Sequence, residues 1–542
     1  LAMLNLRAGE KAMSLATFLD SASYLKAGID VLRDGHWKEH YDLSLQLYSL
    51  YAEVEYCNGH FHEVGRVAGI VIKQATVFEN KLRVYVTLIK TLAGRSMLQD
   101  AINLGMIVLT KLGVECPSPL LPKDIVKRDM MEVKVILEKT TDAEFLSYRE
   151  MTDTNMIAAM KFLQILLPSS FFLAKQQYFP IIVTQMIQLT LLHGTCKESC
   201  VAMGSLSYLL CEYEEFKASD HIGRIAVLLL KKLKAEEYLP HIYVLYFSGV
   251  RCWIMHMALS LEDFLHGYKV GMQIGNIECA MLNAHSYLIN SFMSGRSLVE
   301  LKNELDCFEK QMFEYKQIML GNMALVIHQV VSNLVNSKDS LSLVVSQNME
   351  QEGILAQAIK GNNDSFICHV CILGGIEAYI FGRYELAADI ASKRQETEKK
   401  LSRRTVFYGT TDFYDGLTFL AMAHKIPDAK WGLLVGKAIS KLEHFVQIGT
   451  ANCEHRLLLL QAEAKSLLGD TKDASRDYDL AIAAAEKHRF IHEHAIANER
   501  AGDFFLRNGD PRASQYYGKA HALYLQWGAQ GKADNLSKNI PF

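Results

Sequence analysis

The sequence predicts an all-α fold, a superhelical solenoid of tetratricopeptide-like helical hairpins. Apolar residues recur at i, i+4 and i+7 along much of the chain, which places them on one face of a helix. Glycine turns separate the helices, and Gly59 and Gly94 are 35 residues apart, close to the tetratricopeptide period. No alternating strand pattern occurs, and only 9 prolines among 542 residues interrupt the helical periodicity.

The clearest hairpin lies between residues 457 and 487. A run of helix formers over 457–468 is interrupted by Gly469, and Ala474, Tyr478 and Ala481 then share one helical face. Two small residues on either side of an aromatic ring allow two helices to approach closely. Three more turns have the same pattern: Gly59 with Val64, Ala68 and Val71; Gly382 with Ala387, Ala391 and Arg394; Gly509 with Ala513, Tyr517 and Ala520. We expect these positions, together with Trp527, to form the structural contacts of the repeats.

The N-terminal part is predicted to contain helices over 9–33, 39–57, 61–76, 81–93 and 97–112. The stretch that follows, 113–123, is the densest in proline, with Pro117, Pro119 and Pro122. Proline interrupts helices, so we expect a seam there. The predicted organisation is N-terminal helical repeats over 1–116, the seam over 117–123, central apolar repeats over 124–365 and C-terminal repeats over 366–542.

The central part is the most apolar. Interruptions are expected near Pro168, Pro180, Gly194, Asp220 and Pro240, and hairpins over 261–319 are expected to be separated at Gly271, Gly275 and Gly295. The stretches 155–174 and 238–261 are long enough to cross a membrane, but charged or titratable residues lie within both: Lys161 in the first, and His241, Arg251 and His256 in the second. We therefore interpret both as core helices.

The overall composition excludes several classes of protein. With 57 basic and 60 acidic residues, the net charge of -3 provides no general attraction to nucleic acid or to an anionic membrane. The 11 cysteines have no framework spacing, so they are expected to be thiols in a reducing cytoplasm.

One segment resembles a phosphate-binding loop. Gly432 and Gly436 are followed by Lys437, but three residues instead of four separate the glycines, and Ala438 stands where a hydroxyl residue is needed. The surroundings are helical, so we do not expect a nucleotide there. The triplets 518–520 and 531–533, both Gly-Lys-Ala, are weaker matches still.

Possible metal ligands and basic runs have simpler interpretations. Cys368 and Cys371 lack a second ligand pair and lie in an apolar helical stretch, so a core helix is favoured. His193, Cys196 and Cys200 lack a fourth ligand, and His488, His492 and His494 are interpreted as exposed helix residues. Six basic residues form a predicted solvated face with i, i+4 ion pairs: Lys393, Arg394, Lys399, Lys400, Arg403 and Arg404. We expect no catalytic residues, no cofactor and no metal.

Tyr24, Leu25 and Trp37 near the start of the chain, with Trp527, Gly528 and Ala529 near its close, belong to a pattern that resembles a known family: the tetratricopeptide-like helical region that follows the ATPase module in multidomain predicted-ATPase signalling proteins. The similarity extends over nearly the whole chain, and Trp527, Gly528 and Ala529 are its most specific element. Other matching residues include Tyr24, Leu25, Gly28, Trp37, Tyr41, Asp42, Leu43, Gly59, His60, Phe61, Leu112, Gly113, Val114, Tyr478, Ala481, Ile482, Gly509, Ala513, Tyr516, Ala520 and Tyr524.

This resemblance implies a non-catalytic protein-interaction and signal-relay scaffold. The implied partners are an ATPase domain upstream, a sensor or kinase output domain downstream, and other proteins, without nucleic acid or membrane. We expect an adjoining domain to cover Leu15, Phe18 and Leu19 at one end, and Trp527 and Leu536 at the other. Fold analogy with the superhelical sensor of the maltose-regulon activator leaves one alternative, a small-molecule sensor that binds its ligand in the concave groove.

Overall fold

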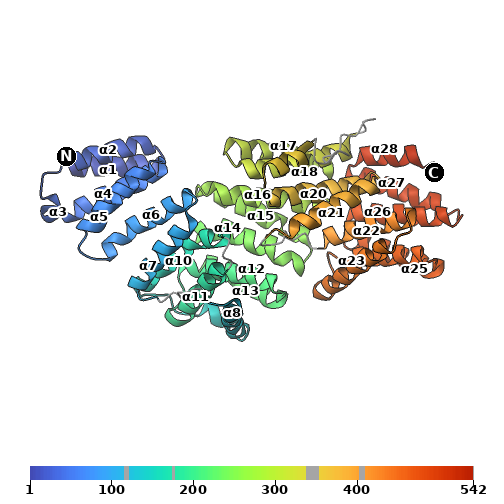
Figure 1. Cartoon of the computed structure of the whole chain (residues 1–542), viewed down its shortest axis with the longest axis horizontal. Helices are drawn as coiled ribbons and strands as arrows, with labels where there is room; N and C mark the ends of the chain where they lie inside the picture. Colours follow the sequence, from blue (N-terminus) through green and yellow to red (C-terminus); the bar gives the residue numbers. More distant parts are fainter. Residues whose placement is uncertain (115–120, 174–176, 337–352, 402–408, 541–542) are drawn as a thin grey trace. The chain divides into compact units, whose positions relative to one another are not determined.

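The chain is all-α, as the sequence predicts. The computed structural model describes residues 1–114, 121–173, 177–336, 353–401 and 409–540 (Figure 1), and these form 28 α-helices. In this described part, the only β feature is an isolated bridge between Glu150 and Thr195. Most helices form antiparallel hairpins with the next helix in the chain, which is the arrangement of tetratricopeptide-like repeats.

The chain divides into two compact units, Leu1–Leu206 and Ser207–Phe542. Part of the predicted seam, residues 117–120, lies outside the described residues, as do residues 337–352 of the central part. The division at 116, 123 and 365 therefore stays a prediction.

Unit 1 consists of four main hairpins. They are formed by α1 (Ala2–Ser14) with α2 (Phe18–Asp30), α4 (Tyr41–Cys57) with α5 (Phe61–Gln74), α6 (Leu82–Gly94) with α7 (Leu98–Lys111), and α10 (Thr154–Phe172) with α11 (Tyr178–His193). The shorter α3 (His36–Glu39) and α9 (Asp142–Leu146), together with α8 (Lys123–Glu138), complete the unit, and α12 (Lys197–Glu212) spans its boundary. Val64, Ala68 and Val71 on α5 are fully buried.

Two predicted interruptions in the central part of the chain are wrong. Pro168 lies inside α10, which continues for four more residues, to Phe172, because its buried faces pack on α6, α7 and α11. In unit 2, Asp220 likewise lies inside a helix, α13 (Phe216–Lys232). The predicted break at Gly194 is confirmed: this residue has φ of 105°, and a Cβ atom there would lie 2.4 Å from the carbonyl oxygen of Arg149.

Unit 2 contains the remaining helices. Its first part comprises α13 (Phe216–Lys232), α14 (Leu239–Tyr243), α15 (Leu261–Gln273), α16 (Ile277–Met293), α17 (Leu298–Glu314), α18 (Ile318–Val335) and α19 (Gly353–Lys360). The predicted core helix over 238–261 is instead a series of short helical segments, including a π-helix over Val244–Ser248. The break at Gly275 is confirmed, whereas Gly271 lies inside α15 against Ala280.

The second part of unit 2 is the most regular. Four hairpins follow one another: α20 (Asp364–Ile380) with α21 (Tyr384–Glu398), α22 (Thr410–Lys425) with α23 (Ala429–Ile448), α24 (Glu454–Leu467) with α25 (Thr471–Lys487), and α26 (Ile491–Arg507) with α27 (Ala513–Trp527). The last helix is α28 (Gln530–Asn539). The turn before α25 shows how the local sequence directs the hairpin: Gly469 adopts φ of 83°, and the Asp470 side chain accepts a hydrogen bond from the Asp473 backbone N–H.

Among the described helices, one is long and apolar enough to cross a membrane. It is α18, with 18 residues and a mean hydropathy of 1.5. This helix packs against α16, α17, α20 and α28 of unit 2.

Candidate functional site

The predicted repeat positions lie inside the hairpins. Ala474, Tyr478 and Ala481 on α25 are fully buried, and α25 packs on α24. Ala513, Tyr517 and Ala520 on α27 are buried where α27 packs on α26. Gly59, Gly382, Gly469 and Gly509 all have positive φ, at the turns before α5, α21, α25 and α27.

Two reciprocal ion pairs join α24 to α26. Arg456 on α24 donates to Glu493 on α26 at 2.9 Å, and Arg500 on α26 donates to Glu463 on α24 at 2.8 Å. The basic partner thus lies on α24 in the first pair and on α26 in the second. On each helix the two charged residues are seven positions apart, so they share one face. All four side chains are almost completely buried.

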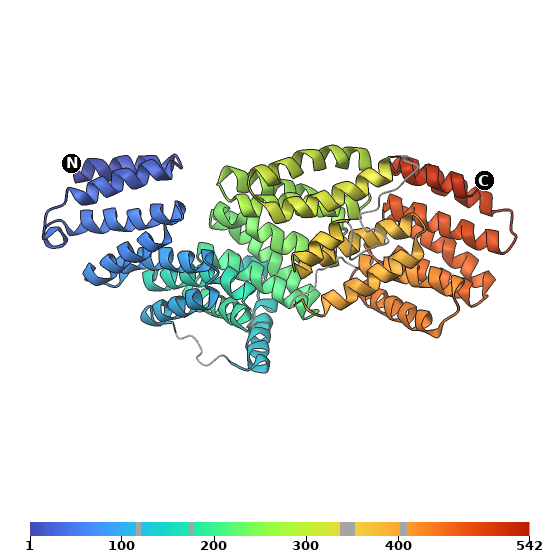
Figure 2. The same cartoon turned by 45° about the horizontal axis from the view of Figure 1, so that its top comes forward.

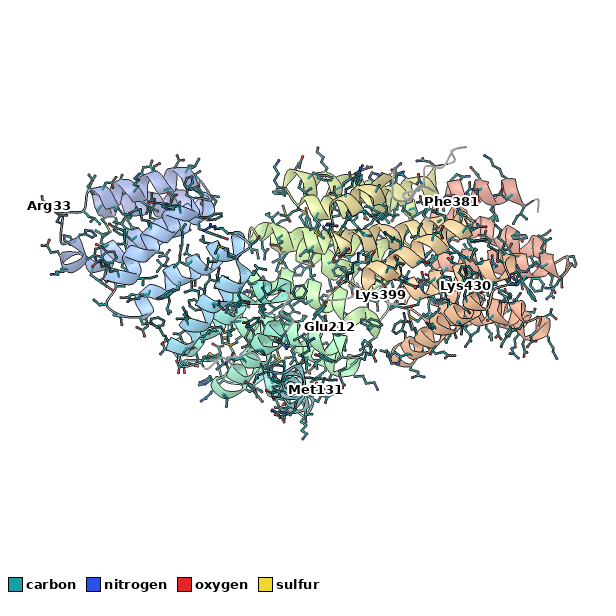
Figure 3. All side chains as sticks on the ribbon, viewed as in Figure 1. Arg33, Met131, Glu212, Phe381, Lys399 and Lys430 are labelled. Carbon is teal, nitrogen blue, oxygen red and sulfur yellow. The ribbon has the colours of Figure 1, made fainter. Side chains whose placement is uncertain are left out.

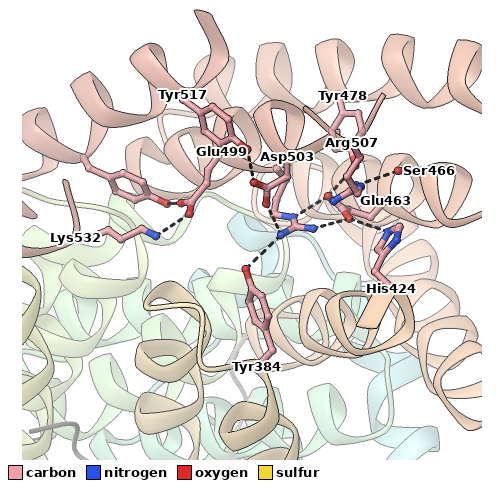
Figure 4. A network of polar contacts seen from close by, with 12 residues as sticks. Tyr384, His424, Glu463, Ser466, Tyr478, Glu499, Asp503, Arg507, Tyr517 and Lys532 are labelled. Carbon is pink, nitrogen blue, oxygen red and sulfur yellow. Dashed lines mark hydrogen bonds and ion pairs between the residues drawn. The ribbon is translucent and has the colours of Figure 1, made fainter. Parts of the chain in front are cut away.

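Tyrosine hydroxyls and a further carboxylate surround Arg500 (Figure 4). Arg500 also donates to Asp503 at 2.8 Å, and Tyr517 donates to the same carboxylate at 2.6 Å. Tyr478 donates to Glu463 at 2.7 Å. Tyr478 and Tyr517, predicted as packing positions, therefore also supply hydrogen bonds to the charges.

These surroundings shift the pKa values of the buried groups. Burial alone would raise the pKa of the Glu463 carboxyl, but the Arg500 guanidinium outweighs burial and holds that pKa below its usual range. At Glu493, Arg456 and His455 outweigh burial in the same way, and the pKa is well below normal. Both carboxylates are therefore ionised in the folded protein at neutral pH.

A second feature of unit 2 is a seam between residues 249–336 and the C-terminal helices. The Asn452 side chain bridges it, donating to the carbonyl oxygens of Cys252 and Met255 at 2.7 and 2.8 Å and accepting from the Met257 N–H at 3.1 Å. Trp253 and Phe445 form an edge contact with ring centroids 5.0 Å apart. This buried amide is hydrogen-bonded through both its oxygen and its nitrogen.

Farther along the same seam, Trp527 packs between two other rings. Its centroid lies 6.1 Å from that of Phe292 on α16 and 5.1 Å from that of His492 on α26. Trp527 and Leu536 are 1% and 2% exposed, so the expectation that an adjoining domain must cover them is wrong, because the chain's own helices already do so. At the other end, Leu15 and Leu19 are largely exposed.

Two surface interpretations also require correction. His492 is buried against Trp527 instead of lying exposed on its helix, and burial lowers its pKa to about 4. Arg394 is buried and pairs with Glu398 and with Asp415 on the neighbouring α22, so it does not belong to a solvated face. In both cases, a neighbouring helix covers a side chain that would be exposed on an isolated helix. Arg403 and Arg404 lie outside the described residues.

The described residues do not show a reactive centre. Among them, no group of three or more His, Cys, Asp or Glu side chains is arranged to hold a metal ion. Cys368 and Cys371 are buried on α20, and burial raises their pKa values to about 11 and about 12, which disfavours the reactive thiolate. Lys437 lies on an exposed face of α23 between turns of regular helix, without the loop that phosphate binding requires.

Two hollows between the described helices are small. One in unit 1, of about 120 Å3, lies between α8 and α11, and one in unit 2, of about 20 Å3, lies among α20, α21 and α22. Pockets that bind drug-sized ligands have volumes of roughly 300 to 1,000 Å3. Among the described residues, the candidate site is therefore the filled interior of unit 2, where buried charged groups form ion pairs with one another.

This interior was not predicted from the sequence. Glu463 lies in the helical run predicted over 457–468, and Arg456, Glu493 and Arg500 lie within the predicted C-terminal repeats, but no ion pair among them was predicted. A signal was present, because the charges at 456 and 463 recur with reversed sign 37 residues later. The contacts of Asn452 lie about 200 residues away in the sequence and leave no such pattern.

The fold and this interior define a helical repeat protein built of tetratricopeptide-like hairpins. No family model and no curated protein matches the sequence. Among solved structures, the chain is similar to a chain of the APC/C hetero-tetramer Cut9–Hcn1, with a TM-score of 0.44 and 11% identity over 98% of this chain and 95% of that one. It is also similar to yeast Tom70, with a TM-score of 0.28 and 11% identity over 95% of this chain and 98% of that one. A circular tandem repeat protein matches with a TM-score of 0.15 and 10% identity, over 99% of this chain and 93% of that one.

Proposed function

We propose that the chain is a non-catalytic scaffold that binds other proteins. The observation that carries this proposal is the division between inside and outside in unit 2. The interior is filled by the chain's own ion pairs and aromatic rings, whereas the outer faces of successive hairpins carry exposed charged residues such as Lys399 and Lys430 (Figure 3). Stacked repeats present long continuous surfaces of this kind, which suit protein partners better than small molecules.

The cellular compartment and the neighbouring domains of the chain form part of the same proposal. We infer a cytoplasmic signal-relay role in a longer protein, with a phosphate-loop ATPase upstream and a sensor or kinase output domain downstream. The sequence resemblance supports this setting. In addition, the ten described cysteines form no disulfide, as is typical of proteins in a reducing compartment. Reading the parent gene tests the setting, because a gene without an upstream phosphate loop makes a free-standing adaptor the better account.

The alternative, a small-molecule sensor, is separated from a scaffold by a thermal-shift screen of the full chain against metabolites. A ligand present at 100 times its Kd stabilises its protein by about 2.7 kcal/mol, which is readily measured. A scaffold should show no such shift with metabolites. It should instead form stable, stoichiometric complexes with specific proteins when tagged and purified from its source cells. If a single metabolite reproducibly raised the unfolding temperature and no stable protein complexes formed, the sensor function would be favoured over the scaffold function.

A further inference from the structure

The last helix of the chain makes an unusual contact. Lys532, in the first turn of α28, is only 3% exposed. Its ammonium donates to Glu499 on α26 at 2.7 Å, and the Tyr524 hydroxyl donates to the other oxygen of the same carboxylate at 2.6 Å (Figure 4). Figures 1 and 2 show the start of α28 next to the end of α18, with which it is in contact.

Nothing in α28 itself favours a lysine at this position. The N-terminal end of a helix carries partial positive charge, which disfavours a cation there, and burial disfavours the charge further. The Glu499 carboxylate compensates for both. The lysine is thus specified by the surface on which α28 lies and not by the stability of α28.

The residue before the lysine is specified in the same way. A Cβ atom on Gly531 would lie 2.4 Å from the carbonyl oxygen of Asn336 and 2.8 Å from that of Asn333, at the end of α18. These are backbone atoms, so they cannot turn away as a flexible side chain can. Only glycine fits between α18 and the docked lysine.

The attachment of α28 is otherwise slight. Of its ten residues, the buried ones are Gly531, Lys532, Ala533 and Leu536, so only two apolar side chains beyond the glycine and lysine are covered. Helices of this length are marginal in water without such contacts. Release of α28 is therefore a local event that leaves the hairpins before it intact.

When α28 leaves, its docking surface keeps its chemistry. Glu499 remains on α26 with Tyr524 beside it, and the carbonyl groups that end α18 remain next to them. The surface carries the negative charge of Glu499 and is narrow beside the end of α18, where only a glycine fits.

We propose that α28 is a resident ligand of this surface, and that a helical segment of a protein partner takes its place. The segment carries a lysine directly after a glycine and an apolar residue four positions after the lysine, as Gly531, Lys532 and Leu536 do. This inference rests on the proposed scaffold function and names the chemistry of one partner. The mode of recognition is an amphipathic helix on a preformed surface.

The test uses the full chain and a labelled peptide with the sequence of residues 528–540. A Lys532→Ala/Leu536→Ala double variant weakens the resident helix, and Lys519→Ala is the matched control. Lys519 is the lysine of a second Gly-Lys-Ala triplet, residues 518–520 on α27, and its side chain is exposed. The double variant should bind the peptide at least about tenfold more tightly than the wild type or the control does. A peptide with alanine in place of its lysine should lose this binding, as should a chain that also carries Glu499→Gln.

Amide hydrogen exchange of the wild-type chain provides an independent readout. The amides of α28 should exchange at least about tenfold faster than those of α26, because α28 opens locally. The proposal would be overturned if all chains bound the peptide equally well or if the double variant did not bind it. It would also be overturned if the amides of α28 were as well protected from exchange as those of α26. A dimer that forms only when α28 is weakened would assign the surface to a second copy of the chain and would likewise overturn it. If the peptide fails while the chain still forms stable complexes with other proteins, the scaffold function stands and only the role of α28 is rejected.

Discussion

The guanidinium of Arg456 lies 2.9 Å from the carboxylate of Glu493, and neither side chain has more than 1% of its surface exposed. Seven residues farther along each helix, Glu463 and Arg500 form the same contact with the charges exchanged. The exchange fixes how α24 and α26 align. Sliding one helix along the other would leave buried charges unpaired or bring like charges together, and both are costly.

Breaking one of these pairs should strongly destabilise unit 2. Arg500→Met leaves the Glu463 carboxylate buried without its cation, so we expect the free energy of unfolding to fall by about 3 to 5 kcal/mol. Urea denaturation followed by circular dichroism measures this change. Lys310→Met is the matched control, because Lys310 and Glu314 form an exposed pair on α17, where the change should stay under about 1 kcal/mol. Equal effects of the two substitutions would contradict a stabilising role for the buried pair.

Stability should fall as the solution becomes acidic. Burial lowers the pKa of both His492 and His256 to about 4. The unfolded chain binds a proton at each ring near pH 6.5 and the folded chain only near pH 4, so acid favours unfolding between these values. His492 alone should reduce the free energy of unfolding by roughly 2 kcal/mol between pH 7 and pH 5.

The two buried carboxylates extend this loss to lower pH. Because Arg500 and Arg456 hold the pKa values of Glu463 and Glu493 below normal against the effect of burial, their contribution is present at neutral pH and is lost as pH falls below the ordinary glutamate value. Urea midpoints measured at several pH values test both stages. In a His492→Gln variant, the difference between pH 7 and pH 5 should shrink; an unchanged difference would show that other groups cause it.

Two glycines of the same region should respond in opposite directions to alanine. A Cβ atom on Gly449 would lie 2.6 Å from the carbonyl oxygen of Trp253 across the seam, so Gly449→Ala should destabilise unit 2 by about 1 to 3 kcal/mol. Gly436 lies within α23 with open space at its Cβ position, so Gly436→Ala should stabilise by about 0.5 to 1 kcal/mol. Thermal unfolding midpoints of the two variants test this. A higher unfolding midpoint for Gly449→Ala would mean that the backbones at Gly449 and Trp253 do not approach closely.

The cysteines should differ widely in reactivity. Cys307 is exposed, whereas Cys371 is buried and has its pKa raised to about 12 by burial. In the native protein near pH 8, iodoacetamide should label Cys307 at least about a hundredfold faster than Cys371, because the thiolate is the reactive form. Mass spectrometry of time-resolved labelling provides the rates. Fast labelling at Cys371, or stoichiometric zinc in the purified chain, would indicate that Cys371 and its neighbour Cys368 have a role beyond packing.

The turns and the faces of the hairpins could be predicted from the sequence because their causes are local. Gly59, Gly382, Gly469 and Gly509 stand where a helix ends in a left-handed turn, and a few neighbouring residues suffice to indicate this. The local rule that proline interrupts a helix failed at Pro168, because tertiary packing keeps α10 helical past this residue. Composition and motif spacing also correctly predicted that Cys368 and Cys371 lie in a core helix.

The sequence by itself therefore determined the all-α class and the succession of hairpins, since helical periodicity and glycine turns act over a few residues. Only the tertiary structure decided which charged residues are buried and what covers Trp527. The His256 Nε2–H donates a hydrogen bond to the carbonyl oxygen of His488, 232 residues away, and Lys532 donates to Glu499, 33 residues back along the chain. Such partners are chosen when distant helices come together, because the free energy of a buried charge depends on what surrounds it and not on its neighbours in sequence.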